Sequence, residues 1–258
     1  MIGIFDSGIG GMTVAHAVEQ LLPEYSLIYY GDIARTPYGP KSPKTIINYS
    51  IRNTEFLLNK GAELIIIACN SASSVATETL RKHFQVPIIE VITPAAKCAI
   101  ESSRNGQIGI IGTRATVKSG IYPKTIGLRC PEFKVHQTAC PLLVPLVEEG
   151  WLNKRETKMI LRRYLHPLKD KQIDTLVLGC THYPLLKKPI QARIGKRVKL
   201  IDSSTQTAQY VKEFLVRNPE IVSRQGRVTH RYYASDTTET ALKVAEHIFS
   251  RPMELIIE

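Results

Sequence analysis

The chain has 258 residues, of which 43% are hydrophobic, and 34 Lys and Arg against 23 Asp and Glu give it a net charge of +11. This composition can bury a sizeable core and excludes an intrinsically disordered chain, and no run of about 18 apolar residues is present that could span a membrane. We interpret the Lys and Arg residues as scattered over a basic, solvated surface; because no nucleic-acid-binding motif is present, we expect no nucleic-acid partner.

The elements expected along the chain alternate between short strands and amphipathic helices. Met1 leads directly into IGIF (2–5) without a basic or cleavable leader, which predicts a cytoplasmic protein. Ser42 followed by Pro43 predicts the start of a helix that ends near Gly61. Further strands are expected at 27–31, 64–68, 87–91, 107–112, 174–179 and 198–201. The pattern predicts an α/β protein of parallel strands, with helices on both faces of each sheet.

Three pairs of segments resemble one another in the same order, as an internal duplication would leave them. IGIFDSGIG from Ile2 resembles IGIIGTRAT from Ile108, an offset of 106 residues. LIIIACNSAS and TLVLGCTHYP place their cysteines 111 residues apart, and EVITPAA and KLIDSST lie 109 residues apart. We therefore expect two similar, pseudo-symmetric halves.

Two of the five cysteines, Cys69 and Cys180, occupy the duplicated position directly after an apolar strand. Open α/β sheets place ligand sites at the carboxyl ends of their strands. A lone cysteine there is more often a small buried hydrophobe, but a duplicated pair favours function. The other three, Cys98, Cys130 and Cys140, are expected to be packing residues, and with no C-x-x-C pair all five are expected to be free thiols.

Two thiols in facing halves suit racemisation, because one group must remove the Cα proton from one face while another delivers a proton to the opposite face. A thiol has an ordinary pKa of about 8.5, so modest tuning can leave one cysteine as thiolate and its partner protonated. Asp6 and His182 are the neighbouring groups expected to help Cys69 and Cys180, respectively. Two structural interpretations stay open: Asp6 could simply cap the turn of DSGIGG, and His182 could be a satisfied polar residue. We interpret Gly8 to Gly11 as a tight turn that carries backbone donors, since the dinucleotide and P-loop spacings are absent.

The motifs DSGIGG (6–11), DIARTPYG (32–39), ACNSAS (68–73), GTRAT (112–116), ACPLLVPLVEEG (139–150) and LGCTHYPLL (178–186) together resemble the glutamate racemase family. They cover almost the first 205 residues in the family's order. The resemblance implies two α/β domains with the active site in the cleft between them, formed by residues 1–92 plus 205–258 and by residues 93–204. It also implies no PLP, metal or nucleotide, glutamate as substrate, a homodimer, and the supply of D-glutamate for peptidoglycan.

The resemblance further implies roles for individual residues. Cys69 and Cys180 resemble the catalytic acid–base pair, assisted by Asp6 and His182. The implied substrate-binding set is Asp6, Ser7, Tyr38, Gly39, Asn70, Ser71, Thr113, Thr116, Glu148, Thr181 and His182. One position departs from the family, which usually has Thr where this chain has Ser71, so we expect the hydrogen bond to be kept with looser packing.

Three alternatives remain open from the sequence. The nearest is a racemase of aspartate or another small acid, which differs in pocket length rather than in chemistry. A single-thiol enzyme of the same fold, such as a decarboxylase, would need only one of Cys69 and Cys180. A non-enzymatic nucleic-acid binder rests on the net charge alone.

Overall fold

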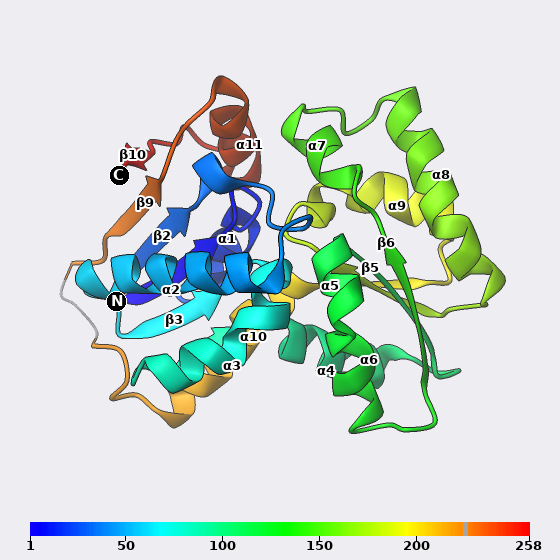
Figure 1. Ribbon diagram of the computed structural model, residues 1–258, viewed down its shortest axis with the longest axis horizontal. Helices are drawn as coiled ribbons and strands as arrows, with labels where there is room; N and C mark the ends of the chain where they lie inside the picture. The colour runs from blue at the N-terminus through cyan, green and yellow to red at the C-terminus, as the bar shows by residue number, and fades with distance from the viewer. Residues whose placement is uncertain (224–226) are drawn as a thin grey trace.

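The computed structural model describes residues 1–223 and 227–258 and arranges their strands in two separate parallel sheets (Figure 1). The first sheet has the order β10-β9-β2-β1-β3-β4 and the second has the order β6-β5-β7-β8. The strands of the first sheet are β1 (Ile2–Asp6), β2 (Leu27–Gly31), β3 (Leu64–Ile67), β4 (Ile88–Glu90), β9 (His230–Ala234) and β10 (Ile256–Ile257). Those of the second are β5 (Gln107–Gly112), β6 (Lys134–Ala139), β7 (Thr175–Gly179) and β8 (Lys199–Asp202).

Helices connect and cover these strands. They are α1 (Met12–Leu21), α2 (Pro43–Asn59), α3 (Asn70–His83), α4 (Ile92–Ser102), α5 (Arg114–Ser119), α6 (Ile121–Gly127), α7 (Leu143–Glu148), α8 (Arg155–Asp170), α9 (Lys187–Ile194), α10 (Ser203–Arg217) and α11 (Glu239–Phe249), with short 3-10 helices η1 (Ile33–Arg35) and η2 (Tyr183–Leu186). None of the helices described is long and apolar enough to cross a membrane.

The first sheet is buried on both faces, as its continuous apolar strands predict. Ile4 and Tyr29 belong to a core cluster with α1, α10 and α11, whereas Phe5 and Ile28 belong to another with α2 and α3. Neighbouring residues of a strand point to opposite faces, so this division follows from the period of two. In the second sheet, Leu176 and Leu178 pack with α7, α8 and α9.

The two sheets share a four-strand order, which confirms the expectation of two similar halves. β2-β1-β3-β4 in the first corresponds to β6-β5-β7-β8 in the second. Three of the four corresponding pairs, β1 with β5, β3 with β7 and β4 with β8, carry the repeated segments. Equivalent pairs lie side by side: Phe5 pairs with Ile67, and Ile111 pairs with Leu178. Both cysteines of the repeat therefore follow equivalent inner strands.

All seven strands expected from the sequence are present, and the helix expected after Ser42 is α2. Ser42 accepts a hydrogen bond from the Thr45 amide at 3.2 Å, with Pro43 in the first turn. Gly61 follows the helix at φ +93°. Three strands were not expected: β6 has a polar, half-buried sequence at a sheet edge, β9 lies in the weakly patterned last 50 residues, and β10 has two exposed residues.

The chain passes between the sheets at two helices that pack against each other, α4 and α10. α4 begins at Ile92 and α10 begins at Ser203, next to the two crossing points expected near Ile92 and Ser204. The domain limits 1–92 plus 205–258 and 93–204 stay a prediction.

Candidate active site

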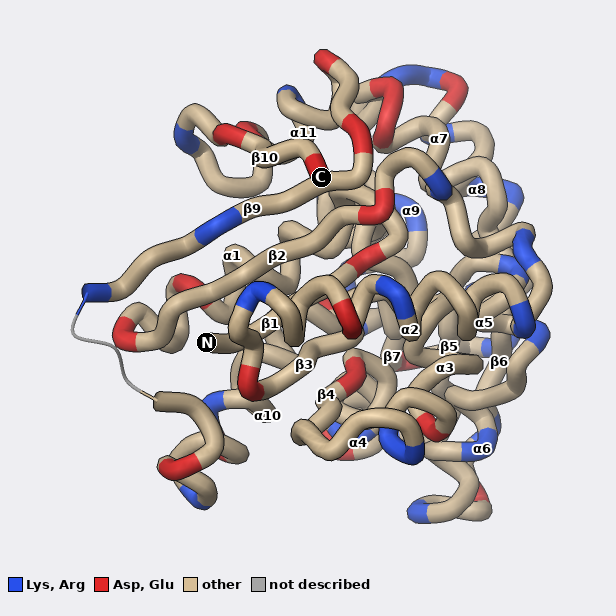
Figure 2. The backbone as a smooth tube through the Cα atoms, turned by 60° about the vertical axis from the view of Figure 1, so that its left-hand side comes forward, with Lys and Arg blue, Asp and Glu red and all other residues tan. Residues whose placement is uncertain are grey.

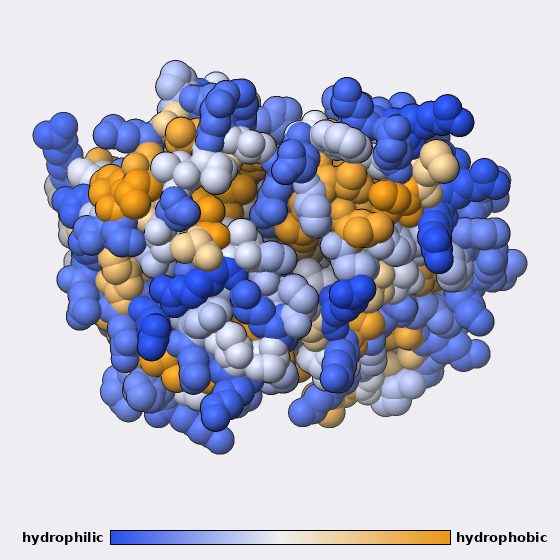
Figure 3. All heavy atoms as spheres, turned by 45° about the horizontal axis from the view of Figure 1, so that its top comes forward, coloured by the Kyte–Doolittle hydropathy of each residue, from blue (hydrophilic) through white to orange (hydrophobic). Residues whose placement is uncertain are grey.

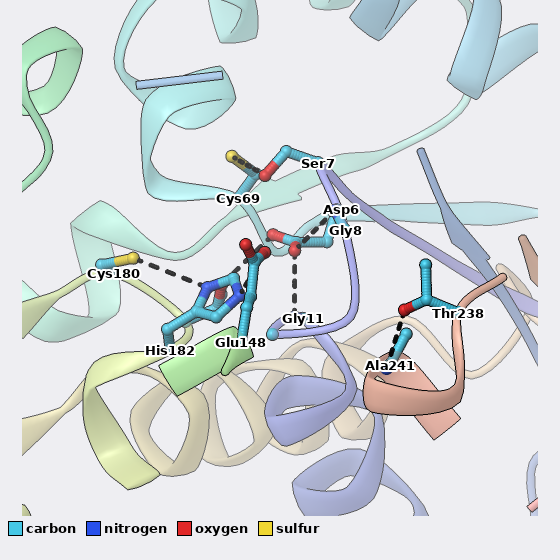
Figure 4. Close-up of polar contacts among 12 residues, drawn as sticks. Asp6, Ser7, Gly8, Gly11, Cys69, Glu148, Cys180, His182, Thr238 and Ala241 are labelled. Atoms are coloured by element: carbon cyan, nitrogen blue, oxygen red, sulfur yellow. Dashed lines mark hydrogen bonds and ion pairs between the residues drawn. The ribbon is translucent and has the colours of Figure 1, made fainter. Parts of the chain in front are cut away.

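Polar side chains from both sheets meet where the strands β1, β3, β5 and β7 end (Figure 4). Asp6 is the last residue of β1, Cys69 begins the turn into α3, and Cys180 follows β7. These groups are almost fully buried: Asp6 is 0%, Cys69 5%, Cys180 6% and His182 2% exposed. The duplicated topology thus brings one thiol from each half to a shared, buried site.

The turn after β1 is organised around the Asp6 carboxylate. One oxygen accepts hydrogen bonds from the amides of Gly8 at 3.1 Å and Gly11 at 3.0 Å. The other accepts from the Thr181 hydroxyl of the second half at 3.3 Å. The prediction that the glycine turn carries backbone donors is confirmed, and these donors serve Asp6. Asp6 therefore caps its turn and also links the two halves.

Cys69 stands at the N-terminus of α3, and its thiol donates to the Ser7 hydroxyl at 3.5 Å. Burial raises the pKa of Cys69, and the negative charge of Asp6 raises it further, to about 12. The structure thus gives Cys69 a hydroxyl as its direct polar partner, while Asp6 acts on it through charge. At neutral pH this thiol is protonated and can serve as a proton donor.

Cys180 has a different neighbour, because the His182 Nδ1 atom lies 3.9 Å from its sulfur. The other ring nitrogen, Nε2, lies 3.3 Å from Glu148 Oε1 as an ion pair, without the alignment of a hydrogen bond. Burial lowers the pKa of His182, but its contacts with Cys180 and Glu148 outweigh burial and raise that pKa to about 10. The result is an imidazolium beside the Cys180 sulfur.

The Asp6 carboxyl also has a shifted proton affinity. Burial raises its pKa above the ordinary value, and the nearby charge of His182 together with the bonds from Gly11, Gly8 and Thr181 opposes this only in part. A carboxyl with a raised pKa is better suited to exchange protons near neutral pH. The site therefore combines a protonated thiol, a second thiol beside a cation, and a buried carboxyl between the two halves.

A second set of polar contacts joins the two halves at the start of α3. The Tyr122 hydroxyl donates to Asn70 Oδ1 at 2.8 Å, while the buried Nδ2 of Asn70 has no partner among the described residues. Ser71 Oγ lies 2.8 Å from Thr113 Oγ1, which in turn lies 3.1 Å from Thr116 Oγ1. The Asn70 amide is an unused donor fixed in place by Tyr122, and unused buried donors in a cleft are typical of a ligand site.

Tyr38 and Gly39 approach the same region from the loop before α2. The Tyr38 hydroxyl bonds to Asp32 and accepts from Asn53 Nδ2 at 3.1 Å, so it is occupied within the protein. Burial is the main cause that raises the pKa of Tyr38 far above its ordinary value. Gly39 abuts the second half, since a Cβ atom there would lie 2.8 Å from Thr113 Cβ. The backbone of this pair therefore offers polar groups next to the second half, while the Tyr38 hydroxyl serves Asp32 and Asn53.

A cavity of about 360 Å³ opens beside the buried groups and is lined in part by Gly8, Thr36 and Glu148. Its far wall comes from the loop before α11, where Thr238 accepts a hydrogen bond from the Ala241 amide at 3.0 Å (Figure 4). The thiols themselves lie outside this cavity. Through Glu148 the cavity borders the His182–Glu148 pair.

Comparison with known proteins agrees with this geometry. A family model described as Asp/Glu/Hydantoin racemase matches residues 12–211. The chain belongs to this family. It is 45% identical to a glutamate racemase of Geobacter metallireducens over 246 residues, which cover 94% of this chain and 90% of that relative.

Two solved structures of the family resemble the whole fold. The glutamate racemase isoform RacE1 from Bacillus anthracis has a TM-score of 0.95 at 33% identity, covering 100% of this chain and 97% of that one. The glutamate racemase from Francisella tularensis in complex with D-glutamate has a TM-score of 0.92 at 35% identity, covering 100% and 96%. The expected family and the two-sheet α/β fold are thus confirmed.

The structure brings together the residues that the sequence singled out in this racemase family member, and it adds others. Asp6, Ser7, Cys69, Asn70 and Ser71 contribute from the first half. The second half contributes Thr113, Thr116, Glu148, Cys180, Thr181 and His182. Their roles remain predictions. Tyr122, which orients Asn70, was not predicted because an isolated tyrosine carries no motif. The part played by Gly10, which packs directly against His182, was not predicted either.

Proposed function

We propose that this chain interconverts L-glutamate and D-glutamate without a cofactor, with Cys69 and Cys180 transferring the Cα proton. The observation that carries the proposal is the pair of buried thiols at equivalent strand ends of two similar sheets, each with its own polar partner. This arrangement supplies a base on one side of a bound substrate and an acid on the other. The family makes the activity that of an isomerase.

The unlike surroundings of the thiols assign their resting roles. Cys69 is held as a thiol by burial and by the charge of Asp6, whereas Cys180 lies beside the His182 imidazolium. Cys180 is then prepared to remove a proton and Cys69 to deliver one. We assign this direction to L-glutamate as substrate, and the reverse roles to D-glutamate. His182 assists Cys180 and Asp6 assists Cys69, each by holding or releasing the proton that its thiol exchanges.

Substrate carboxylates have donors available on both sides of the thiols. The unpartnered Asn70 Nδ2 and the first-turn amides of α3 offer neutral donors, and the helix dipole favours an anion at this end. Ser7, Thr181 and the backbone of Tyr38 and Gly39 complete the set. We propose that Ser71, Thr113 and Thr116 hold the closed cleft through their hydroxyl chain, and that Glu148 acts mainly through His182.

The choice of glutamate over aspartate rests on relatives rather than on the site's chemistry, which would serve either acid. The relative and the two structures compared above are all named glutamate racemases, at 33% to 45% identity. We further propose that the protein is a cytoplasmic homodimer and that its D-glutamate enters peptidoglycan. A single-thiol activity is disfavoured because both thiols are placed equivalently.

The deciding experiment incubates the purified protein with L-glutamate in deuterated water without added cofactor. Chiral analysis should show formation of D-glutamate, and the product should carry deuterium at Cα. Parallel reactions with L-aspartate test the rival substrate, and prior dialysis against hydroxylamine tests for a hidden carbonyl cofactor. Loss of activity that PLP restores, or turnover of aspartate but not glutamate, would contradict the proposal. Size-exclusion chromatography with light scattering tests the dimer.

A further inference from the structure

The positive charge of the molecule is concentrated in one stretch of the second half. Thirteen of the 34 Lys and Arg residues lie between Lys154 and Lys199, against three acidic residues, so this stretch carries a formal charge of +10 out of +11. The interpretation of a scattered basic surface is therefore wrong. The remainder of the chain is almost electrically neutral, and the excess charge needs an explanation specific to this stretch.

The fold turns all of these cations outward. α8 buries Leu161, Leu165 and Leu168 along one stripe, and α9 buries Ile190 and Ile194. These stripes leave the remaining faces of both helices to solvent, and all thirteen Lys and Arg side chains belong to exposed residues. The Lys and Arg positions on α8 and α9 are marked in Figure 2, and hydrophilic residues cover the α8 edge of the molecule in Figure 3. We call the surface formed by these thirteen Lys and Arg residues, on α8, α9 and their flanks, the basic face.

The cations of the basic face lack acidic partners. Among the described residues, 1–223 and 227–258, none of the thirteen Lys and Arg residues forms an ion pair. Apart from the His182–Glu148 pair of the active site, the ion pair in this stretch joins His166 to Asp170 at 3.3 Å. Where α8 meets α9, a groove of about 580 Å³ is lined by Arg162, Lys169 and Arg193 together with that pair. Mutual repulsion of unpaired like charges destabilises a protein. A bound polyanion would reduce this repulsion.

We propose that the basic face binds the phosphate backbone of nucleic acid without sequence preference. The 16 residues of α8 extend about 24 Å, which spans about seven phosphates of one strand at about 3.4 Å each. The face also lacks the features of a membrane-binding surface: beyond Met159, no exposed large apolar side chain occurs up to Lys199, so nothing on the groove would enter a lipid layer. Its location on the outer side of α8 and α9 leaves the thiol site free to work while it is occupied (Figure 1).

The test measures fluorescence anisotropy of a labelled 20-base-pair DNA duplex with the full-length protein between 50 and 200 mM KCl. Binding should weaken steeply with salt, because each phosphate contact releases a counterion and contributes about 0.9 to the slope of log K against log salt. The groove variant Arg162→Gln/Lys169→Gln/Arg193→Gln should lower that slope by about 2.7 and weaken binding at 50 mM by at least about tenfold.

The control removes the same charge elsewhere. Arg52→Gln/Lys82→Gln/Lys212→Gln neutralises three exposed cations of the first half and should leave the slope nearly unchanged. Both variants should keep wild-type racemisation, which shows that they are folded and separates this inference from the proposed catalytic function. If both variants weakened DNA binding equally, net charge alone would explain the binding, and the proposal would be overturned. Absence of binding at 50 mM would do the same, as would tighter binding to phosphatidylserine vesicles than to the duplex.

Discussion

Gly10 offers a direct test of how closely the site is packed around His182. A Cβ atom at this position would lie 2.4 Å from His182 Nδ1, 2.6 Å from its Cε1 and 2.8 Å from Thr181 Oγ1. Real contacts to Cβ are about an ångström longer, so Gly10→Ala must displace the imidazole or the turn. The imidazole is buried and held by Cys180 and Glu148, so it can move only by changing those contacts.

The expected effect is large on catalysis and moderate on stability. A displacement of about 1 Å in a catalytic group can reduce turnover by about 100-fold. Overpacking of this kind costs about 1–3 kcal/mol of folding free energy. Because His182 is the neighbour of Cys180, the step in which Cys180 exchanges the proton should become more rate-limiting. Gly10→Ala should therefore lower kcat by about 100-fold and raise the Cα-deuterium isotope effect more from L-glutamate than from D-glutamate.

The assay follows both directions by circular dichroism, with protiated and Cα-deuterated substrates, alongside urea unfolding of the same preparation. Gly127→Ala is the matched control, because a Cβ there would meet no atom within 4 Å. It should leave kcat and stability close to wild type. A Gly10→Ala protein that is folded and retains turnover within about twofold would refute the view that this glycine fixes the imidazole.

Three further predictions concern ionisable groups of the site. Cys69→Ser and Cys180→Ser should each reduce turnover by at least about 100-fold, the usual size of an acid–base contribution, whereas Cys140→Ser should keep most of it; comparable loss in folded Cys140→Ser would contradict the assignment. The pKa of His182 is about 10 in the folded protein against an ordinary 6.5, so its proton contributes stability that is complete below pH 6.5 and is lost as pH rises through about 10. His182→Asn should therefore flatten the fall in unfolding free energy measured between pH 6.5 and 10. An unchanged slope in this variant would exclude His182 as the source of the pH dependence. In His182→Asn the Cα-deuterium isotope effect should rise more from L-glutamate, and in Asp6→Asn more from D-glutamate; equal effects in both variants would show that the helpers act on a shared step.

The strands and the positions of the two thiols could be predicted because both depend on short, local stretches of sequence. Apolar runs such as those before Cys69 and Cys180 form buried parallel strands wherever helices cover both faces, and the repeated order of segments carries over to the strand order. A residue directly after such a strand reaches the carboxyl edge of the sheet whatever the details of packing. The fold class and the place of each thiol at the carboxyl edge of its own sheet therefore follow from sequence pattern.

The contacts between the halves could not be predicted in this way. The bond from Thr181 to Asp6 joins residues 175 positions apart, and the bond from Tyr122 to Asn70 joins residues 52 apart. Such pairs depend on how the two halves pack against each other, and the hydrophobic periodicity of the sequence does not predict that packing. The strand β6 was missed for a related reason: its half-buried edge position tolerates the polar residues of Lys134–Ala139, so the apolar signal of a strand is absent.

The balance between symmetry and asymmetry explains how one scaffold can serve both proton transfers. Equivalent strands deliver equivalent thiols, but the groups around them differ. Cys69 has a serine and a buried carboxylate from β1 and its turn, and Cys180 has a histidine from its own turn and Glu148 from α7. For each enantiomer one thiol must start charged while the other starts protonated, and the two thiols exchange these roles between the enantiomers. Free L- and D-glutamate have equal energy, so the two directions must keep equal kcat/KM whatever the helpers do. The asymmetry of the turns can thus appear only in kcat, KM and isotope effects, which is where mutation of either helper has to be measured.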